Sequence, residues 1–329
     1  MVLLYWYAGI FSDSNACTMA GKDFAFSADK NNGPNCSIRK MEAVNMDMSI
    51  FKNIDTVYVT GHKNPDADSH VSSKIMCDIL KANGINAVWT FFEGDTAGKG
   101  EKLIEDVLDI NPFIMSRSEI GDKKFLLVDH NDVSQSVGCA DNVIAAIDHH
   151  VDSGQIKNLF LSDYCCTALY IYMMFKDSYE FSGCQKTQIF RAVLSDSVFG
   201  KSSRYKPTDA QAVKALGYNT NYDEYFEKFF VPTDLTKAPE IFGKNGLKSY
   251  SFEKAQFVST YIEATDTKLL CDYEQFIRDY DGDFLGIWID YTQPKTFVYF
   301  KMGGTVHHLT YDCIASRAAT IMPQIVKLF

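Results

Sequence analysis

The chain has 329 residues, of which 46% are hydrophobic and 22% are charged, and its formal net charge at pH 7 is −10. This length is enough for two domains with separate cores, and the composition is that of a globular protein rather than a fibrous or disordered one. The negative charge argues against a general nucleic-acid or anionic-membrane surface.

Cysteine spacing and hydropathy argue against disulfide-rich, zinc-knuckle, membrane-spanning and secreted proteins. None of the nine cysteines stands in a C-x-x-C pair, so we expect reduced thiols in a cytoplasmic protein rather than a zinc knuckle or a disulfide scaffold. No apolar stretch reaches the roughly 18 residues of a membrane-spanning helix. The apolar start, residues 1–11, lacks a basic region and a clear cleavage site, so we do not expect a signal peptide.

In chain order, three parts can be distinguished. Residues 1–47 are predicted to be an N-terminal extension, because Ser, Asn, Asp, Gly and Lys predominate over much of it without sustained periodicity. In residues 48–230, apolar runs alternate with helical patterns, which predicts a doubly wound, mostly parallel sheet. We expect strands at 56–59, 87–92, 125–128 and 143–147, and helices at 69–81, 102–108, 167–175 and 208–217.

The pattern changes around residues 229–250, where several prolines and glycines interrupt it. We predict that residues 231–329 form a smaller C-terminal α/β domain that binds substrate. Its expected elements are strands at 255–262, 284–289 and 296–301 and a helix at 268–280. The active site is expected in the cleft between the two domains.

Four clusters of acidic and histidine residues are the most informative feature of the chain. They are His62-Lys63-Asn64-Pro65-Asp66-Ala67-Asp68, Asp129-His130-Asn131, Asp148-His149-His150 and Ser195-Asp196. Three follow apolar runs that predict buried strands, and the fourth ends the mixed run 189–194, so we interpret all four as post-strand clusters. Because ligands bind beyond the carboxyl ends of parallel strands, the four clusters should converge there.

The residue types in these clusters predict a metal site. A lone Asp-His pair is usually a surface turn or a satisfied polar contact, but four of the chain's seven histidines lie in the clusters. Carboxylates mixed with imidazole suit Mn²⁺, Co²⁺ or Mg²⁺. The six candidate ligands are too many for one tetrahedral ion and suit two metals that share a carboxylate, an arrangement used to hydrolyse phosphoryl groups. These six are His62, Asp66, Asp68, Asp129, His149 and Asp196.

The four clusters resemble the motifs of the DHH phosphoesterase superfamily and, more closely, those of family II inorganic pyrophosphatases. The resemblance runs from about residue 50 to the C-terminus, and Asp234-Leu235-Thr236-Lys237 and Ser316-Arg317 are part of it. It implies hydrolysis of pyrophosphate or a short polyphosphate with two or more Mn²⁺ or Co²⁺ ions, with Mg²⁺ as a further candidate. It also implies a homodimer formed by the first domain.

The resemblance assigns a role to each motif residue. His62, Asp66 and Asp129 would hold one metal, and Asp68, Asp129, His149 and Asp196 the other, with Asp129 bridging. Asp148 would orient the neighbouring ligands and His150 would contact the phosphate. Lys237 and Arg317 would stabilise the leaving phosphate.

Two departures from the family pattern leave the substrate open. The family's C-terminal motif runs Ser-Arg-Lys-Lys, whereas this chain has Ser316-Arg317-Ala318-Ala319, so that Lys301, Lys237 or Lys201 would have to compensate. The segment 163–167 also replaces a small, glycine-containing one. An exopolyphosphatase or another DHH-type phosphoesterase is therefore the alternative, and a catalytically inactive scaffold is a third hypothesis, against which the intact metal ligands speak.

Two further motifs are not expected to carry chemistry. Gly303-Gly304-Thr305-Val306-His307-His308 is predicted to be a strand end or surface segment rather than a nucleic-acid-binding loop, and Cys165-Cys166 is predicted to be packed in the interior.

Overall fold

The computed structural model of the chain describes residues 46–95, 103–108, 111–252 and 255–327. Most of the predicted extension, residues 1–47, therefore lies outside the described residues. Of its last two residues, Met46 is buried and Asp47 caps a short 3-10 helix, Met48–Phe51, by accepting a hydrogen bond from Ser49 N at 2.8 Å. The first described element thus begins at Met48, the first residue of the predicted domain.

The first sheet has six strands that pair in parallel in the order β3-β2-β1-β4-β5-β6. They are β1 (Val57–Thr60), β2 (Ala87–Phe92), β3 (Phe113–Met115), β4 (Lys124–Val128), β5 (Val143–Asp148) and β6 (Leu159–Leu161). The apolar runs form strands here because both faces are covered: Leu126 and Ile147 enter one hydrophobic core, and Phe125 and Ala146 another. The predicted α/β fold with a parallel sheet is confirmed.

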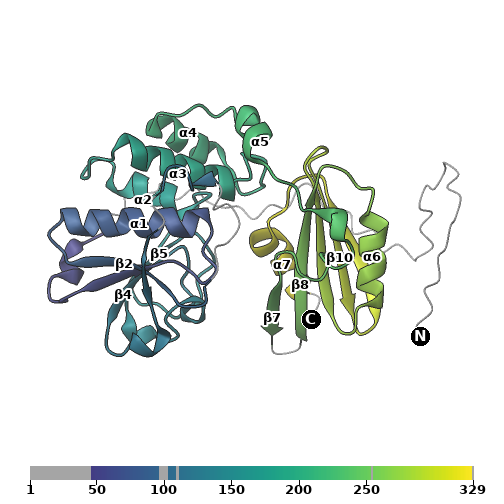
Figure 1. Cartoon of the computed structure of the whole chain (residues 1–329), viewed down its shortest axis with the longest axis horizontal. Helices are drawn as coiled ribbons and strands as arrows, with labels where there is room; N and C mark the ends of the chain where they lie inside the picture. The colour runs from purple at the N-terminus through teal and green to yellow at the C-terminus, as the bar shows by residue number, and fades with distance from the viewer. Residues whose placement is uncertain (1–45, 96–102, 109–110, 253–254, 328–329) are drawn as a thin grey trace, which may run out of the picture. The chain divides into compact units, whose positions relative to one another are not determined.

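Helices α1, α2 and α3 lie together along one face of this sheet (Figure 1). The helices of this region are α1 (Ala67–Ala82), α2 (Thr167–Phe175), α3 (Gly183–Asp196), α4 (Pro207–Leu216) and α5 (Asp223–Phe229). Their ends follow local sequence signals, since Ser182 and Gln185 form a capping box before α3, and α4 ends at Gly217 with a left-handed φ of 100°. The helices predicted at 69–81, 167–175 and 208–217 are confirmed.

Two predictions for this region are wrong. Residues 103–108 form turns rather than part of a helix, because a segment this short gains little from helix formation by itself. The run 189–194 belongs to α3, so Ser195-Asp196 ends a helix and is not a post-strand cluster. The periodicity of so short an apolar run does not distinguish a buried strand from a buried helix.

The strand order places the ends of three strands at one point of the sheet edge. β1 and β4 are neighbours although β2 and β3 come between them in sequence, so the strand order reverses at this pair. Open parallel sheets bind ligands outside the carboxyl ends of the strands at such a reversal. The first and second clusters follow β1 and β4, and the third begins at the end of β5, beside β4.

The second sheet has five strands in the order β11-β10-β9-β8-β7, of which only β8 and β9 pair in parallel. Its elements are β7 (Lys248–Phe252), β8 (Ala255–Ala264), α6 (Leu270–Asp279), β9 (Phe284–Asp290), β10 (Lys295–Met302), β11 (Thr305–Tyr311), the π-helical turn Arg317–Ile321 and α7 (Met322–Val326). The three predicted strands and the helix at 268–280 are confirmed, whereas β7 was not predicted. Gly303 and Gly304 form the turn before β11, consistent with the strand-end role predicted for them.

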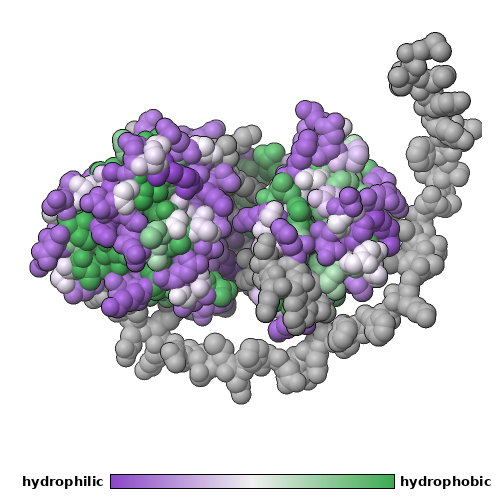
Figure 2. Space-filling view, turned by 90° about the horizontal axis from the view of Figure 1, so that it is seen from below, coloured by the Kyte–Doolittle hydropathy of each residue, from purple (hydrophilic) through white to green (hydrophobic). Residues whose placement is uncertain are grey.

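Hydrophilic residues cover most of the surface seen in Figure 2, with apolar patches between them. Large exposed apolar side chains occur on both edges of the first sheet, at Phe113 and Ile114 of β3 and at Leu161 of β6. Such edges are the places where a sheet can pair with another strand. Within the described ranges, we find no helix with the length and apolar character needed to cross a membrane.

The second sheet provides a matched pair of glycines for a stability test. Gly246 has a φ of 59° and a Cβ there would lie 1.9 Å from Cε1 of Tyr261, whereas Gly303 has a φ of 54° and open space around it. Alanine at either position incurs the left-handed backbone penalty of about 1–2 kcal/mol, but only Gly246→Ala adds a clash. We expect Gly246→Ala to lower the free energy of unfolding by about 1–3 kcal/mol more than Gly303→Ala, measured by urea denaturation. Equal losses would contradict the packing seen around Tyr261.

Candidate metal centre

The first cluster turns sharply between β1 and α1 because Gly61 allows Ser69 to approach the backbone. His62 N donates to Ser69 Oγ at 3.0 Å, and a Cβ at Gly61 would lie 1.9 Å from that oxygen. Asp66 caps α1 by accepting from Ser69 N at 3.1 Å, and Asp68 is fully buried in the first helical turn. This turn therefore places His62 and Asp66 in one group of possible metal ligands and Asp68 in a second.

The other clusters are placed by the ends of β4, β5 and α3. Asp129 follows β4 in a left-handed conformation, φ 62°, and its N–H donates to Ile147 O on β5 at 3.0 Å. Asp148 is the last residue of β5, His149 follows it, and Asp196 is the last residue of α3. The left-handed turn at Asp129 re-aims the chain directly after the strand, so that its carboxylate lies among the other three clusters.

The six predicted ligands form two groups that share Asp129. In one group, His62 Nε2 lies 3.3 Å from Asp129 Oδ2 and 3.6 Å from Asp66 Oδ2. In the other, His149 Nε2 lies 3.3 Å from Asp129 Oδ1, 3.5 Å from Asp196 Oδ2 and 4.0 Å from Asp68 Oδ2. Within each group, the ligand atoms all lie within 4.8 Å of one another. Asp129 thus presents one oxygen to each group.

The N-terminus of α2 holds two of these carboxylates. Thr167 N donates to Asp68 Oδ2 at 2.6 Å and Ala168 N to Asp68 Oδ1 at 2.8 Å, while Thr167 Oγ1 donates to Asp129 Oδ1 at 3.2 Å. A helix N-terminus has unpaired N–H groups and a partial positive charge, both of which stabilise a carboxylate. Sequence reasoning did not identify this support, since α2 is distant in sequence from both aspartates.

The pKa shifts in the centre follow from burial and from the crowding of like charges. Burial, together with the charge of Asp129, raises the pKa of Asp68 and of Asp196 well above the usual range. Burial also acts to raise the pKa of Asp129, but the imidazoles of His149 and His62 beside it hold that pKa well below its usual range. Burial and the neighbouring His150 lower the pKa of His149, which favours the neutral imidazole that ligates metals.

The residues present fit a divalent cation. His149 Nε2 is buried without a hydrogen-bond partner among the described residues, although three carboxylates face it. A buried polar atom without a partner is costly, and a cation between the imidazole and the carboxylates would satisfy it. Oxygen ligands combined with imidazole nitrogen suit ions such as Mn²⁺.

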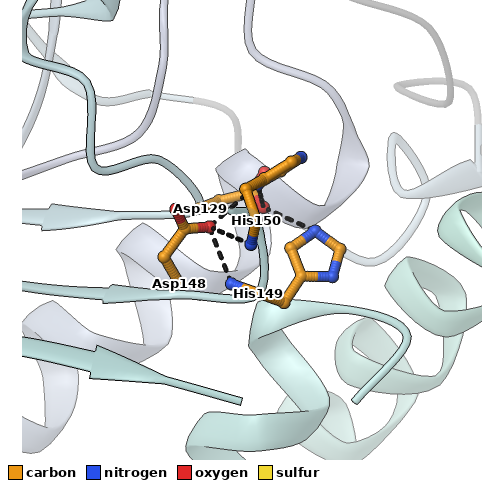
Figure 3. A group of neighbouring side chains, drawn as sticks. All are labelled: Asp129, Asp148, His149 and His150. Atoms are coloured by element: carbon orange, nitrogen blue, oxygen red, sulfur yellow. Dashed lines mark hydrogen bonds and ion pairs between the residues drawn. The ribbon is translucent and has the colours of Figure 1, made fainter. Parts of the chain in front are cut away.

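Asp148 and His150 adjoin the centre in a different way (Figure 3). Asp148 Oδ1 accepts hydrogen bonds from His149 N at 2.7 Å, from His150 N at 3.1 Å and from His150 Nδ1 at 2.8 Å, while Oδ2 accepts from Asn131 Nδ2. The Asp148 carboxylate is therefore occupied by protein donors. The His150 ring is partly exposed, at 39%, and its Nδ1 lies 3.9 Å from Asp129 Oδ1.

His130, the remaining histidine of the clusters, does not face the two groups. Its Nδ1 lies 2.9 Å from Val128 O and its Nε2 lies 2.6 Å from Ser136 Oγ. Burial lowers the pKa of His130 to about 4, so the ring is neutral near pH 7. It joins the end of β4 to the loop that follows.

The structure does not bring the two predicted phosphate-binding cations into contact with the clusters. Lys237 is exposed at the end of the 3-10 helix Leu235–Lys237 and forms no ion pair with any described residue. Arg317 donates from Nη1 to Gly246 O at 2.8 Å and lies over the Tyr261 ring.

Two cations that sequence reasoning missed act on the centre. Lys248, at the start of β7, is exposed, yet the surrounding protein and the charge of Arg317 lower its pKa, while Asp66 and Asp129 act on that pKa in the opposite direction. Arg204 donates from Nη2 to His149 O at 2.8 Å. Arg204 lies close in sequence to Lys201-Ser202, but nothing in the local pattern indicates where its side chain points.

Comparison with known proteins covers the first sheet and helices α1 to α3. Residues 56–195 match the model of the DHH family, N-terminal domain, and this range contains the first three clusters and Ser195 of the fourth. This part of the chain is similar to the N-terminal domain of the DHH family. The predicted resemblance to the DHH superfamily is thereby confirmed.

The chain is also similar to two curated proteins, both named "Probable manganese-dependent inorganic pyrophosphatase". One, from Staphylococcus saprophyticus, is 29% identical over 214 residues, which cover 61% of this chain and 68% of that protein. The other, from Staphylococcus carnosus, is 28% identical over 172 residues, covering 50% of this chain and 55% of that protein. The chain thus spans about two thirds of one relative and about half of the other.

A solved structure is similar over a larger part of the chain. It comes from a Methanococcus jannaschii protein assigned to the family II inorganic pyrophosphatases, and it matches with a TM-score of 0.62 and 19% identity. The match covers 82% of this chain and 98% of that protein. At this identity the match shows the fold alone, and it extends beyond residues 56–195.

Because Asp129 faces both ligand groups, its replacement by asparagine is predicted to reduce metal affinity strongly. Asp129→Asn keeps the size of the side chain but removes the charge that faces both groups. We expect Mn²⁺ affinity to fall roughly 100-fold or more, because even residues that only orient ligands are worth about 10–100-fold. Isothermal titration with Mn²⁺ measures this, with Asp141→Asn on the exposed surface as the control. Unchanged affinity in Asp129→Asn would exclude its bridging position.

The pKa shifts predict how the stabilisation of the protein by bound Mn²⁺ changes with pH. The raised pKa of Asp68 and Asp196 means that the metal-free fold binds protons there more tightly than the unfolded chain. Its stability therefore falls as pH rises through those pKa values, whereas cations bind better once their ligands are deprotonated. We expect the Mn²⁺-induced increase in Tm to be larger at about pH 7.5 than at about pH 5.5. Thermal melts with and without Mn²⁺ test this, and an increase that shrinks as pH rises would contradict it.

Proposed function

We propose that this chain is a metal-dependent inorganic pyrophosphatase that hydrolyses pyrophosphate to two phosphates. The observation that carries the proposal is the geometry of Asp129, whose two oxygens face His62 and His149 in separate ligand groups 3.3 Å away. Such a shared carboxylate is the arrangement expected of a two-metal phosphoryl-transfer centre. The manganese-dependent pyrophosphatases to which the chain is similar support this choice of reaction.

In this proposal, His62, Asp66 and Asp129 hold one ion, and Asp68, Asp129, His149 and Asp196 hold the other. The ions are Mn²⁺ or Co²⁺, with Mg²⁺ as a further candidate. When bound, such ions supply positive charge to phosphate oxygens and lower the pKa of the attacking water. The buried N-terminus of α2 and the left-handed turn at Asp129 keep the ligand carboxylates in place before substrate arrives.

His150 is the proposed phosphate contact on the protein side. Asp148 accepts its Nδ1–H at 2.8 Å, which fixes the ring and leaves Nε2 directed away from that carboxylate. When the ring is doubly protonated, the Asp148 charge balances it and Nε2 can donate to a phosphate oxygen. Asp148 is thus a positioning residue, and it contacts neither ion in this proposal.

Cleavage requires cations for the leaving phosphate. Attack of water on one phosphorus breaks the bridging P–O bond, and negative charge accumulates on the phosphate that leaves. Arg317, Lys237 and the newly identified Lys248 are the proposed sources of positive charge in the C-terminal part of the chain. Lys248 has the most direct support, because Asp66 and Asp129 already act on its charge.

The proposal includes the domain organisation predicted from the sequence. Residues 48–230 would form the metal-binding domain and residues 231–329 the substrate-binding domain, with the active site in a cleft between them. The separate six-stranded and five-stranded sheets support this division.

A homodimer in the cytoplasm completes the proposal. The exposed apolar side chains on the edge strands β3 and β6 support pairing of the first domain across a two-fold axis. The free, buried thiols of Cys77, Cys165 and Cys166 support a reducing compartment. Analytical ultracentrifugation of the Mn²⁺-loaded protein tests the dimer.

A substrate panel tests the proposed activity. We expect the Mn²⁺-loaded protein to release phosphate from pyrophosphate faster than from tripolyphosphate, long polyphosphate or a dinucleotide. Phosphate release at equal concentrations of phosphoanhydride bonds measures this preference, and EDTA should abolish it. Preference for a longer chain would favour the exopolyphosphatase alternative. Hydrolysis of none of the four, in a sample shown to bind Mn²⁺, would favour the inactive scaffold.

A further inference from the structure

Arg204 places a guanidinium beside the metal centre, on the side of His149. It lies in the loop between α3 and α4, after Asp196. Its Nη2 is 2.8 Å from His149 O and 3.1 Å from His149 Nδ1. Neither a predicted motif nor the proposed mechanism uses this residue.

The loop that carries Arg204 is held at several points. Arg204 N donates to Ser202 Oγ at 3.3 Å, and Ser203 N donates to Ile314 O at 2.9 Å. Ser202 also forms an isolated parallel bridge with Ile314. With its backbone held and its Nη2 on His149, the guanidinium has a defined position at the centre.

Most donors of Arg204 are left without a partner. Of the five N–H groups of the guanidinium, His149 O accepts one from Nη2, whereas His149 Nδ1, 3.3 Å from Tyr164 O, carries the proton when Nε2 is the metal ligand and so does not accept. Nε and Nη1 have no hydrogen-bond partner in the part of the chain that the structure describes, and no described carboxylate lies within 4.0 Å to form an ion pair with it. The side chain is half-buried. A half-buried cation with several unused donors, beside a cluster of metal ligands, is suited to an anion that binds at the same centre.

We propose that Arg204 binds a phosphate group of the substrate through Nε–H and Nη1–H, while Nη2 remains on His149 O. This inference rests on the proposed function, because it takes a phosphoanhydride as the ligand. Arginine is suited to the role, since its planar donors match phosphate oxygens and its charge is permanent. The chain has alanine at positions 318 and 319, after Arg317, so those positions supply no cation. Arg204 supplies one from the loop between α3 and α4.

Binding of inorganic phosphate to the Mn²⁺-loaded protein tests the proposal directly. We expect Arg204→Gln to weaken phosphate binding by roughly 10–100-fold in isothermal titration, because charge-assisted hydrogen bonds are lost. Its Mn²⁺ affinity should stay within about threefold of the wild type, since none of the proposed ligands is changed. Arg278→Gln, an exposed arginine paired with Glu274 on α6, is the matched control and should change neither affinity.

The same variant should show a raised KM for pyrophosphate. Arg204→Lys retains the charge and should recover part of the phosphate affinity, whereas a residue that only positions His149 would not be rescued in this way. A loss of Mn²⁺ affinity equal to the loss of phosphate affinity would overturn the proposal, because Arg204 would then act only through His149. Unchanged phosphate affinity in Arg204→Gln, or absent phosphate binding in the wild type, would overturn it as well.

The failure of the proposed function is distinguishable from the failure of this inference. If the wild type binds phosphate but does not hydrolyse pyrophosphate, the proposed function fails. In that case, an Arg204→Gln variant that loses phosphate affinity still supports the role of Arg204 as an anion-binding residue.

Discussion

The sharing of one carboxylate by two histidines is the constraint on which the centre depends. Asp129 Oδ2 faces His62 and Oδ1 faces His149, so a small rotation of this side chain would disturb both groups. Three features hold it: the left-handed backbone directly after β4, the hydrogen bond from its N–H to β5, and the Thr167 hydroxyl. Because Thr167 and Ala168 also hold Asp68, the N-terminus of α2 is the common support of both carboxylates.

This arrangement is electrostatically unfavourable without cations. Asp68 is completely buried and Asp129 is 1% exposed, and both share a small volume with Asp66 and Asp196. Burial and this crowding raise the pKa of Asp68 and of Asp196, and His149 Nε2 has no hydrogen-bond partner among the described residues. Buried carboxylates crowded around an unpaired imidazole nitrogen destabilise a fold. Such a cluster is therefore expected to have a function.

The sequence predicted those parts of the fold and site in which a local residue pattern is compatible with only one kind of secondary structure. The strands ending at Val128 and Asp148 were predictable because continuous apolar runs require burial on both faces. The position of Asp196 at the end of α3 was not, because the run before it is apolar enough for either a strand or a buried helix. The tertiary contacts of α3 decide between them, since Arg191 on this helix donates to Leu103 O at 2.9 Å.

Long-range contacts account for what the sequence did not predict in the site. Arg204 and Lys248 lie in segments without periodicity or a motif of their own, and only the tertiary fold brings their charges to the clusters. Thr167 was visible only as the start of an apolar helix. A residue whose role depends on where a loop or helix end points leaves no signal at its own position in a single sequence.

The charge balance of the centre explains why such dispersed cations matter. Four aspartates contribute about four negative charges, which two divalent ions would approximately neutralise. A phosphoanhydride adds several more negative charges. Cations from the protein are needed to bind this substrate and to stabilise the charge on the phosphate that leaves. The charge of Arg204 acts on Asp196, and the charge of Lys248 on β7 interacts with Asp66 and Asp129, so the two cations act on the centre from separate segments. Substrate preference in this chain would then depend on where these cations lie, because each one sets the position of the phosphate group that it binds.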